Sequence, residues 1–412
     1  MARGELTEAV LSSADPLAPI DLAVGVLTFN NAETLDGVLA TVADGVGRFP
    51  DVRAALVVAD AGSSDATRER AAAAPIPTLV VEHEAPAGER VAVPFHGIPG
   101  RGTALRATFA MAHRLRARAL VLIEADAVSA TPTWIERLAR PLLEEKADFI
   151  TAAYARHRYE GTISRLVLAP LVRTLYGRRL QHPFGGQQAL SARLVEHLLI
   201  HPKWSWTGAD VSDLWITGTA IADGFNVWEA WLGPHQVRSR TRAIDLPAMI
   251  AQTLGAAFTV MQRHEDLWLE VRGSEPIPAV GEPVPPGVEP MEVDVDRMLE
   301  AFRQGARDLT AIWELILAPD TLAEVLALDT GGRFRFPDDL WARVVYDFAL
   351  GHHYSVVHRD HLLRSLTPLY LGRTAAFVLA TRTAGVEATL AHLDAVAAAF
   401  ERQKAYLVEH WR

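Results

Sequence analysis

Residues 119–135 read ALVLIEADAVSATPTWI, and this stretch guides the interpretation of the whole chain. Its first five residues are all apolar, which is typical of a central strand in a parallel sheet that is covered on both faces. The strand then ends on two carboxylates, Glu124 and Asp126, with one residue between them. In open α/β sheets, ligands bind beyond the carboxyl ends of such strands. The sequence therefore predicts two like charges at a place where a ligand is expected.

Two interpretations of this acidic pair are open. Carboxylates two positions apart repel each other unless a cation lies between them, and Mg²⁺ is typically held by one or two carboxylates together with substrate phosphates. Alternatively, the two acidic residues only begin a solvated turn, because short acidic pairs are common in loops. The rest of the chain has to decide between a cation site and a turn.

Strand-like and helix-like segments alternate from residue 21 onward, which predicts an α/β fold with a mostly parallel, doubly wound sheet. Apolar strands are expected at 22–29, 54–62, 78–84, 119–124, 147–157 and 225–233. Helical spacing of apolar residues is found at 30–46 and again from about Thr103. We also expect a helix interrupted by Pro170 at 162–177 and a long helix at 246–271.

The chain divides into an N-terminal extension (1–20), an α/β domain (21–272), a linker (273–291) and an α-helical C-terminal domain (292–412). Within the α/β domain, residues 21–150 form the expected donor half and residues 151–272 the expected acceptor half. The linker is so rich in Pro and Gly that it is expected to join neither a helix nor a sheet.

Composition excludes several classes of protein. The chain has 412 residues, a formal net charge of −10 and no cysteine. An acidic chain argues against a nucleic-acid partner, and the lack of cysteine excludes disulfides and thiolate metal sites. The sequence contains neither a signal-peptide-like segment nor the roughly 18 consecutive apolar residues of a membrane span. We therefore expect a cytoplasmic protein without a membrane partner.

Four loops fall at or near the carboxyl ends of the expected strands. Besides the acidic pair, these loops contribute Thr28 and Asn30, Asp60 and Gly62, and Gly100 and Arg101. Arg101 lies just before a helix N-terminus, which favours binding of a diphosphate. Neither a GxGxxG nor a GxxxxGK[ST] phosphate loop is present. Together the four loops favour a nucleotide diphosphate that lies across the sheet and is held by a cation.

These loops resemble the donor-binding motifs of glycosyltransferases with the GT-A fold. The segments VVADAGSSDAT (57–67), PGRGTALRA (99–107) and VLIEADA (121–127) stand where that family has DSGSTD, GKG.AL and an acidic triplet. HPFGGQQALSARLV (182–195) and WSWTGADVSDLWIT (204–217) resemble the retaining enzymes that make mannosylglycerate, glucosyl-3-phosphoglycerate or mannosyl-3-phosphoglycerate. The helical C-terminal region resembles the extension of mannosylglycerate synthase.

The resemblance implies a role for each matching residue. Asp60 would contact the nucleoside, Arg101 would meet the diphosphate, and Asp126 would be the main ligand of Mg²⁺ or Mn²⁺. Asp210 would face the acceptor. The sugar would be lined by Gly185, Gly186 and Gln187, and further metal ligands would come from Glu124 and His235.

The chain also departs from the family pattern. Glu124 replaces an Asp, Gln187 replaces a Glu, and His235 stands about two positions early. The segment YEGTISR (159–165) lacks an Arg at the position where users of phosphoglycerate carry one, which favours unphosphorylated glycerate or a related hydroxy acid as acceptor. Arg158 and Arg165 could substitute for it.

The function expected from these residues is metal-dependent, retaining transfer of mannose or glucose from a nucleotide diphosphate sugar to a small hydroxy acid such as D-glycerate or 3-phosphoglycerate. The protein is expected to be a homodimer. Two alternatives stay open. One is an inverting GT-A transferase that acts on a polysaccharide or lipid acceptor, and the other is a nucleotide-sugar-binding protein that has lost catalysis.

Overall fold

The computed structural model describes residues 6–91, 93–94, 96–183, 185–201, 213–236, 245–328 and 334–411. The chain forms two compact units. Unit 1 comprises residues 1–155, 182–243 and 277–284, and unit 2 comprises residues 156–181, 244–276 and 285–412.

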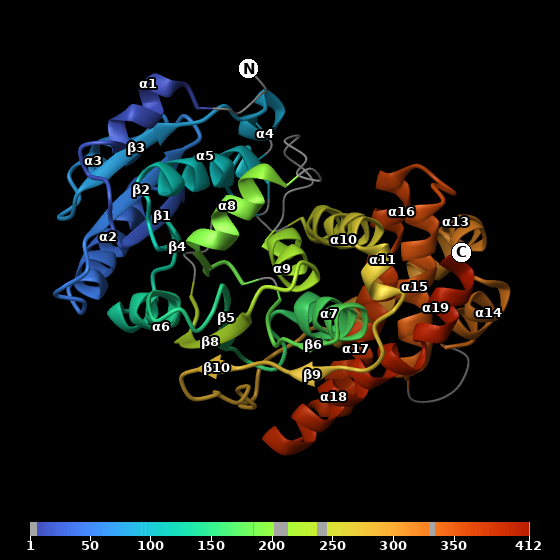
Figure 1. Cartoon of the computed structure of the whole chain (residues 1–412). Helices are drawn as coiled ribbons and strands as arrows, with labels where there is room; N and C mark the ends of the chain where they lie inside the picture. The colour runs from blue at the N-terminus through green and yellow to red at the C-terminus, as the bar shows by residue number, and fades with distance from the viewer. Residues whose placement is uncertain are drawn as a thin grey trace. The chain divides into compact units, whose positions relative to one another are not determined.

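Unit 1 is built on one eight-stranded sheet with the strand order β10-β8-β5-β7-β4-β1-β2-β3 (Figure 1). Every pairing in it is parallel except the two made by β7. This arrangement confirms the expected α/β class and all six expected strands. The strands are β1 (Leu22–Thr28), β2 (Ala54–Asp60), β3 (Thr78–Glu82), β4 (Ala119–Glu124), β5 (Phe149–Ala155), β7 (Gln188–Ser191), β8 (Val227–Pro234) and β10 (Ala279–Val280).

Helices cover both faces of this sheet. Successive side chains of β1 point to opposite faces, and their contacts show which helices pack on each face. Leu22, Val24 and Val26 belong to the apolar core formed with α2 (Ala32–Val46) and α6 (Pro132–Leu143). On the other face, a side chain at Gly25 would collide with Thr108 of α5. The remaining helices of unit 1 are α1 (Glu8–Leu11), the 3-10 turn η1 (Ser12–Ala14), α3 (Thr67–Ala72), α4 (Ala87–Val91), α5 (Arg101–Arg114), α8 (Ala192–Ile200) and α9 (Asp213–Ala222).

The sheet contains two elements that the sequence did not reveal. The short strand β7 lies between β4 and β5 and runs antiparallel to both. The expectation that the Pro/Gly-rich linker joins no sheet is wrong. Ala279 and Val280 form edge strand β10, where the missing N–H of a neighbouring proline costs nothing, and the carbonyl of Pro278 accepts from Glu229 N.

Unit 2 is almost entirely helical. It also contains segments 156–181 and 244–276, of which the sequence analysis placed residues 156–181 and 244–272 in the α/β domain and residues 273–276 in the linker. Within unit 2, α7 packs on α18, and α10 packs on α15 and α16. Its elements are the π-helical turn η2 (Ser164–Leu168), α7 (Ala169–Tyr176), α10 (Leu246–Arg263), α11 (Glu265–Trp268), α12 (Val295–Asp308), α13 (Thr310–Ile316), α14 (Pro319–Ala327), α15 (Asp338–His353), α16 (Arg359–Ser365), α17 (Thr367–Thr381), α18 (Val386–Arg402) and α19 (Lys404–Trp411), with the two-residue strands β6 (Arg178–Arg179) and β9 (Glu275–Pro276).

Two expected helices are divided. Pro170 stands near the start of α7, where its missing N–H needs no partner, and the turn before it is π-helical. The expected helix at 246–271 ends as α10 at Arg263 and resumes as the short α11. Among the helices described, none has both the length and the apolar character that crossing a membrane requires.

Candidate functional site

The carboxyl ends of β1, β2 and β4 meet at one edge of the sheet, as the sequence predicted. Thr28 is in register with Asp60, and Leu27 is in register with Glu124. A pocket opens at this edge and spans about 350 Å³ of space not filled by protein atoms, part of which is open solvent. We call it the strand-end pocket; its lining residues are Leu27, His96, Ile98, Arg101, Leu122, Ile123, Glu124, Ala125, Asp126 and Gly186.

Asp60 organises the loops after β1 and β2. Its side chain is fully buried, and its Oδ1 accepts from the N–H groups of Gly62 (3.0 Å) and Ser63 (2.7 Å). Its Oδ2 accepts from the hydroxyls of Thr28 (2.8 Å) and Ser63 (2.5 Å). Four donors therefore satisfy this carboxylate within the protein. The predicted contact of Asp60 with a nucleoside stays a prediction, and its visible role is to shape the loops.

Asn30 ties the same two loops together from the outside. It adopts a left-handed conformation with φ 53°, which Asn tolerates better than most residues. Its backbone N–H donates to Ser63 Oγ at 2.9 Å, and its side-chain Oδ1 accepts from Ser64 N at 2.8 Å. The predicted group of Thr28, Asn30, Asp60 and Gly62 thus lies in one hydrogen-bonded cluster.

Glu124 stands at the end of β4 within a polar network. Gln187 Nε2 donates to Glu124 Oε2 at 3.2 Å, and the Oε1 of Gln187 accepts from the Tyr154 hydroxyl. On the other side, His235 Nε2 lies 3.6 Å from Glu124 Oε2. Tyr154 also holds the His235 ring in place, with the two ring centroids 4.2 Å apart. The structure therefore brings together three residues that the sequence singled out.

The network keeps Glu124 ionised. Burial would raise the pKa of Glu124, but the neighbouring His235 imidazole, the charge of Arg101 and the amide of Gln187 outweigh it and lower this pKa to about 2. At neutral pH the pocket therefore contains a carboxylate anion.

Gly186 provides the space that Glu124 occupies. A Cβ at this position would lie 2.2 Å from Glu124 Oε1, and one at Gly185 would lie 2.8 Å from the carbonyl oxygen of Ala152. Both glycines are thus required by close approach, in the segment that the sequence predicted to line a sugar.

Asp126 lines the same pocket two residues after Glu124. The loop between them is held by two backbone bonds, from Ala127 N to Glu124 O and from Val128 N to Asp126 O. The hydroxyl of Thr34 on α2 donates to the carbonyl of Ala125 at 2.7 Å. These contacts fix the turn, so both carboxylates remain at the pocket.

Arg101 is the first residue of α5 and is buried. Gly100 precedes it in a left-handed conformation with φ 62°, and its N–H donates to Glu89 Oε2 at 2.8 Å. The Nη2 of Arg101 donates to both carboxylate oxygens of Asp213, at 2.8 and 3.0 Å, while its buried Nε makes no hydrogen bond to any residue that the structure describes. The sequence placed Arg101 correctly at the pocket but gave no indication of this partner.

Electrostatics around Arg101 involve three carboxylates. Burial alone would lower the pKa of Arg101, but Asp213, Glu124 and Asp126 outweigh it, and the pKa is raised. Burial raises the pKa of Asp213, and the charge of Arg101 opposes that rise. The guanidinium is thus a permanent positive charge beside the acidic pair.

Some functional residues were missed or cannot be placed. Asp210 lies outside the described residues. Asp213, three positions later in the same segment, could have been noticed as a second acid in WSWTGADVSDLWIT. Tyr154 stood unmarked in an apolar strand, and only its position beside β7 shows its role. Ser63 was part of the quoted DAGSSD loop but was not assigned a role.

Comparisons with known proteins give structural likenesses only. No family model matches the chain, and no curated protein matches it by sequence. Among solved structures, glucosyl-3-phosphoglycerate synthase from Mycobacterium tuberculosis, in complex with Mn²⁺, UDP and glucosyl-3-phosphoglycerate, is 21% identical, with a TM-score of 0.44, over 64% of this chain and 86% of that chain. The same enzyme with Mg²⁺ and UDP is 22% identical, with a TM-score of 0.43, over the same shares of both chains.

Proposed function

We propose that this chain is a retaining GT-A glycosyltransferase that moves mannose or glucose from a nucleotide diphosphate sugar to a small hydroxy acid such as D-glycerate or 3-phosphoglycerate. The observation that supports this most strongly is the strand-end pocket, where Glu124 and Asp126 lie beside the buried cation Arg101 at the carboxyl ends of parallel strands. The pocket has the mixture of charges that a diphosphate bound through a divalent cation needs.

Asp126 and Glu124 of the strand-end pocket and the neighbouring His235 offer donor types that suit a divalent cation, although their ligand atoms do not all lie within 4.8 Å of one another before an ion binds. Carboxylate oxygens from Asp126 and Glu124, together with the His235 imidazole, are donors that Mg²⁺ or Mn²⁺ accepts. His235 Nε2 and Glu124 Oε2 are 3.6 Å apart, close to the separation of two ligands around one ion, and Glu124 is ionised at neutral pH. A bound cation would supply positive charge to the diphosphate as it leaves.

The loops after β1 and β2 would hold the nucleoside. Because Asp60 is satisfied internally, the groups offered to a ligand are those of the loop that it shapes, around Gly62 and Asn30. In this proposal the buried carboxylate preorganises the binding loop.

Transfer breaks the bond between the anomeric carbon and the phosphate oxygen, and the acceptor hydroxyl oxygen forms the new bond to that carbon. The proton of the hydroxyl passes to the departing phosphate, so no separate base is required for retention. Arg101 would stabilise the charge that develops on the diphosphate, as a fixed cation in a dry site does. Gln187 would hold Glu124 in position through the 3.2 Å bond from its Nε2. Asp210 would face the acceptor.

The test is a matrix of donors and acceptors with the purified full chain. GDP-mannose, GDP-glucose and UDP-glucose would each be combined with D-glycerate, 3-phosphoglycerate and D-lactate, with Mg²⁺ or Mn²⁺ and with EDTA as the control. We expect one donor and acceptor pair to give a glycoside whose anomeric configuration, read by NMR, matches that of the donor. Absence of transfer from every donor would reject this function. An inverted product would instead favour the inverting GT-A transferase. A homodimer in the cytoplasm stays a prediction, which light scattering and cell fractionation would check.

One observation favours a second candidate, a nucleotide-sugar-binding protein without turnover. The Nη2 of Arg101 is already held by Asp213, and Gln187 is engaged at both ends of its amide. Such a protein would bind a nucleotide sugar in calorimetry but neither transfer nor hydrolyse it over long incubations.

A further inference from the structure

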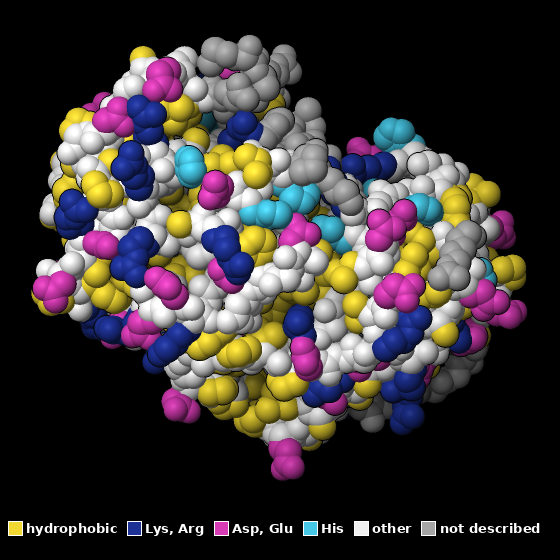
Figure 2. All heavy atoms as spheres, in the orientation of Figure 1, with side chains coloured by type: hydrophobic (Ala, Val, Ile, Leu, Met, Phe, Trp, Pro, Cys, Tyr) yellow, Lys and Arg dark blue, Asp and Glu magenta, His cyan; other side chains and the backbone are white. Residues whose placement is uncertain are grey.

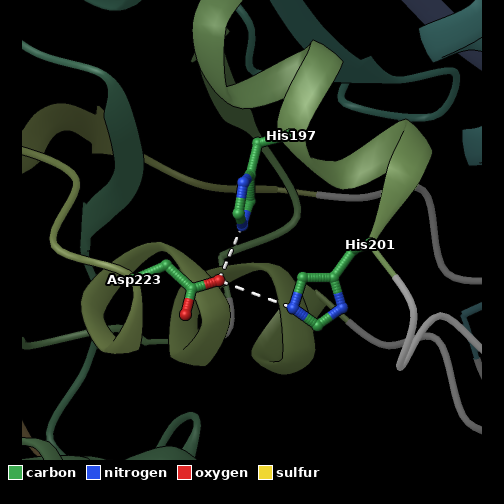
Figure 3. A group of neighbouring side chains, drawn as sticks. All are labelled: His197, His201 and Asp223. Atoms are coloured by element: carbon green, nitrogen blue, oxygen red, sulfur yellow. Dashed lines mark hydrogen bonds and ion pairs between the residues drawn. The ribbon is translucent and has the colours of Figure 1, made fainter.

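Three side chains at the ends of α8 and α9 converge, and none of them lines the strand-end pocket. His197 lies in the last turn of α8, His201 caps the same helix, and Asp223 directly follows α9 (Figure 3). His197 Nε2 lies 2.7 Å from Asp223 Oδ2, and His201 Nε2 lies 3.5 Å from the same oxygen. We call these residues the His-His-Asp cluster.

The local sequence produces this geometry. Residues four apart on a helix share one face, so the HLLIH segment (197–201) presents both imidazoles to the same side. Aromatic neighbours limit the freedom of both rings. The His197 ring centroid lies 5.1 Å from that of Phe225, and the His201 ring meets Trp215 edge-on at 5.5 Å.

The cluster is reachable from solvent, yet not fully exposed. The side chains of His197 and Asp223 are 35% and 33% exposed, and that of His201 is 10% exposed. Figure 2, drawn in the orientation of Figure 1, shows histidine side chains at the surface where α8 and α9 lie. An ion could therefore enter without unfolding the helices.

The simpler explanation is that Asp223 only accepts hydrogen bonds from the two imidazoles. Two features go beyond it. Ligand atoms of all three residues lie within 4.8 Å of one another, the one such group of three found in the described parts of the chain. Ligand atoms around a tetrahedral Zn²⁺ at the usual bond lengths are roughly 3.3 Å apart, so the observed 2.7 and 3.5 Å bracket the required spacing.

We propose that His197, His201 and Asp223 bind one divalent transition-metal ion of the Zn²⁺ class. Two imidazoles and one carboxylate match the ligand preference of Zn²⁺, whereas Mg²⁺ prefers oxygen ligands and retains its water. Water would complete the tetrahedron. The site is independent of the proposed glycosyl transfer and uses none of its residues.

A metal at this place has a structural consequence. It joins the end of α8 to the end of α9, and the first residue of α9 is Asp213, which holds Arg101. A metal ion that binds the folded chain but not the unfolded chain raises the stability of the fold. We therefore expect Zn²⁺ to raise the melting temperature of the protein.

The experiment measures Zn²⁺ binding by calorimetry on untagged, EDTA-treated full chain. The background carries Asp126→Ala and His235→Ala, which removes the ligands proposed for the catalytic cation. We expect one Zn²⁺ per chain in this background, no comparable binding of Mg²⁺, and Co²⁺ visible absorption typical of a four-coordinate site. His197→Ala and Asp223→Ala should each weaken Zn²⁺ binding at least about tenfold, since loss of a mere second-sphere partner already costs that much.

The matched control is His361→Ala, which alters an exposed histidine paired with His358 (ring centroids 5.7 Å apart) and should leave binding unchanged. Circular dichroism checks that each variant is folded. If His197→Ala is not folded, His197→Gln is used in its place. Absence of Zn²⁺ binding in the background, or equal affinity in the His197 variant, would overturn the proposal.

Discussion

Arg101 at the start of α5 holds Asp213 at the start of α9 through hydrogen bonds of 2.8 and 3.0 Å, with both side chains less than one tenth exposed. This pair joins two helices of unit 1 that are 112 residues apart in sequence. It also fixes the guanidinium that lines the strand-end pocket.

Removal of one partner of this pair should be costly. Asp213→Ala leaves the buried guanidinium without the carboxylate that accepts its hydrogen bonds, and we expect the free energy of unfolding to fall by about 3 kcal/mol in urea titrations, since Glu124 and Asp126 still offset part of its charge. Replacing both residues, as Arg101→Met with Asp213→Leu, should restore most of that loss, since apolar pairs often match buried ion pairs in stability. Glu300→Ala, which breaks an exposed pair with Arg307, is the control and should change little. Equal effects of Asp213→Ala and Glu300→Ala would show that the buried pair contributes nothing special.

Asp126 is the residue on which the cation proposal depends most. Asp126→Ala should abolish hexose transfer at saturating Mg²⁺ or Mn²⁺, because the main ligand of the ion is lost. Asp44→Ala, at an exposed position of α2, is the control and should transfer normally. Product formation is followed by chromatography, and thermal unfolding verifies that both variants are folded. Near-normal turnover of the Asp126 variant would remove its assigned role.

The low pKa of Glu124 predicts a pH dependence of stability. Because its pKa is about 2 in the folded chain and 4.5 ordinarily, the ionised form stabilises the fold above pH 4.5, and this contribution is lost as the pH falls toward 2. The contribution is at most on the order of 3 kcal/mol. Glu124→Gln should therefore lose less stability than the parent chain between pH 5.5 and pH 3 in urea unfolding. Parallel curves for the two proteins would mean that Glu124 has an ordinary pKa.

Gln187 should tune cation binding through Glu124. Gln187→Leu removes the 3.2 Å bond to Glu124 and is expected to weaken Mn²⁺ binding by about 10–100-fold, the usual effect of losing a group that orients a ligand. Tyr154→Phe removes only the hydroxyl that donates to Gln187. It should also weaken Mn²⁺ binding, but by a smaller factor than Gln187→Leu. Calorimetric Mn²⁺ affinities that stay at the parent value in both variants would contradict this role.

Gly186 and Gly37 offer a matched pair of substitutions. A Cβ at position 186 would fall 2.2–2.4 Å from the Glu124 carboxyl group, whereas nothing lies within 4 Å of a Cβ at position 37. Gly186→Ala should displace Glu124, weakening Mn²⁺ binding and lowering the melting temperature. Gly37→Ala lies inside α2 and should stabilise the chain by about 0.5–1 kcal/mol. If both substitutions proved harmless, the space at Gly186 would not be needed by Glu124.

Sequence patterns predicted the structure well where a single strand or helix is enough to explain the pattern. All six expected strands were found, because a run such as residues 119–123 is apolar on both faces and can only be satisfied inside a sheet. The residues chosen at the strand ends also came together: Thr28 bonds to Asp60, and Glu124 lies beside Arg101 and His235.

Contacts between residues far apart in the chain were not predicted from the sequence. Strand β7 is four residues long, and Asp213 meets Arg101 from 112 residues further along the chain. Neither contact has a period or a spacing that a local pattern could reveal. The two edge residues of β10 were hidden by prolines that normally argue against a strand.

The amino-acid order alone determined that this protein builds a mostly parallel sheet and carries its acidic pair at the end of β4, since burial of apolar runs and alternation of elements are local properties. Only the tertiary structure decided that Asp60 is satisfied internally, that Gln187 and His235 flank Glu124, and that His197, His201 and Asp223 converge. Those outcomes depend on which distant atoms come within hydrogen-bonding reach, and chain packing sets these distances.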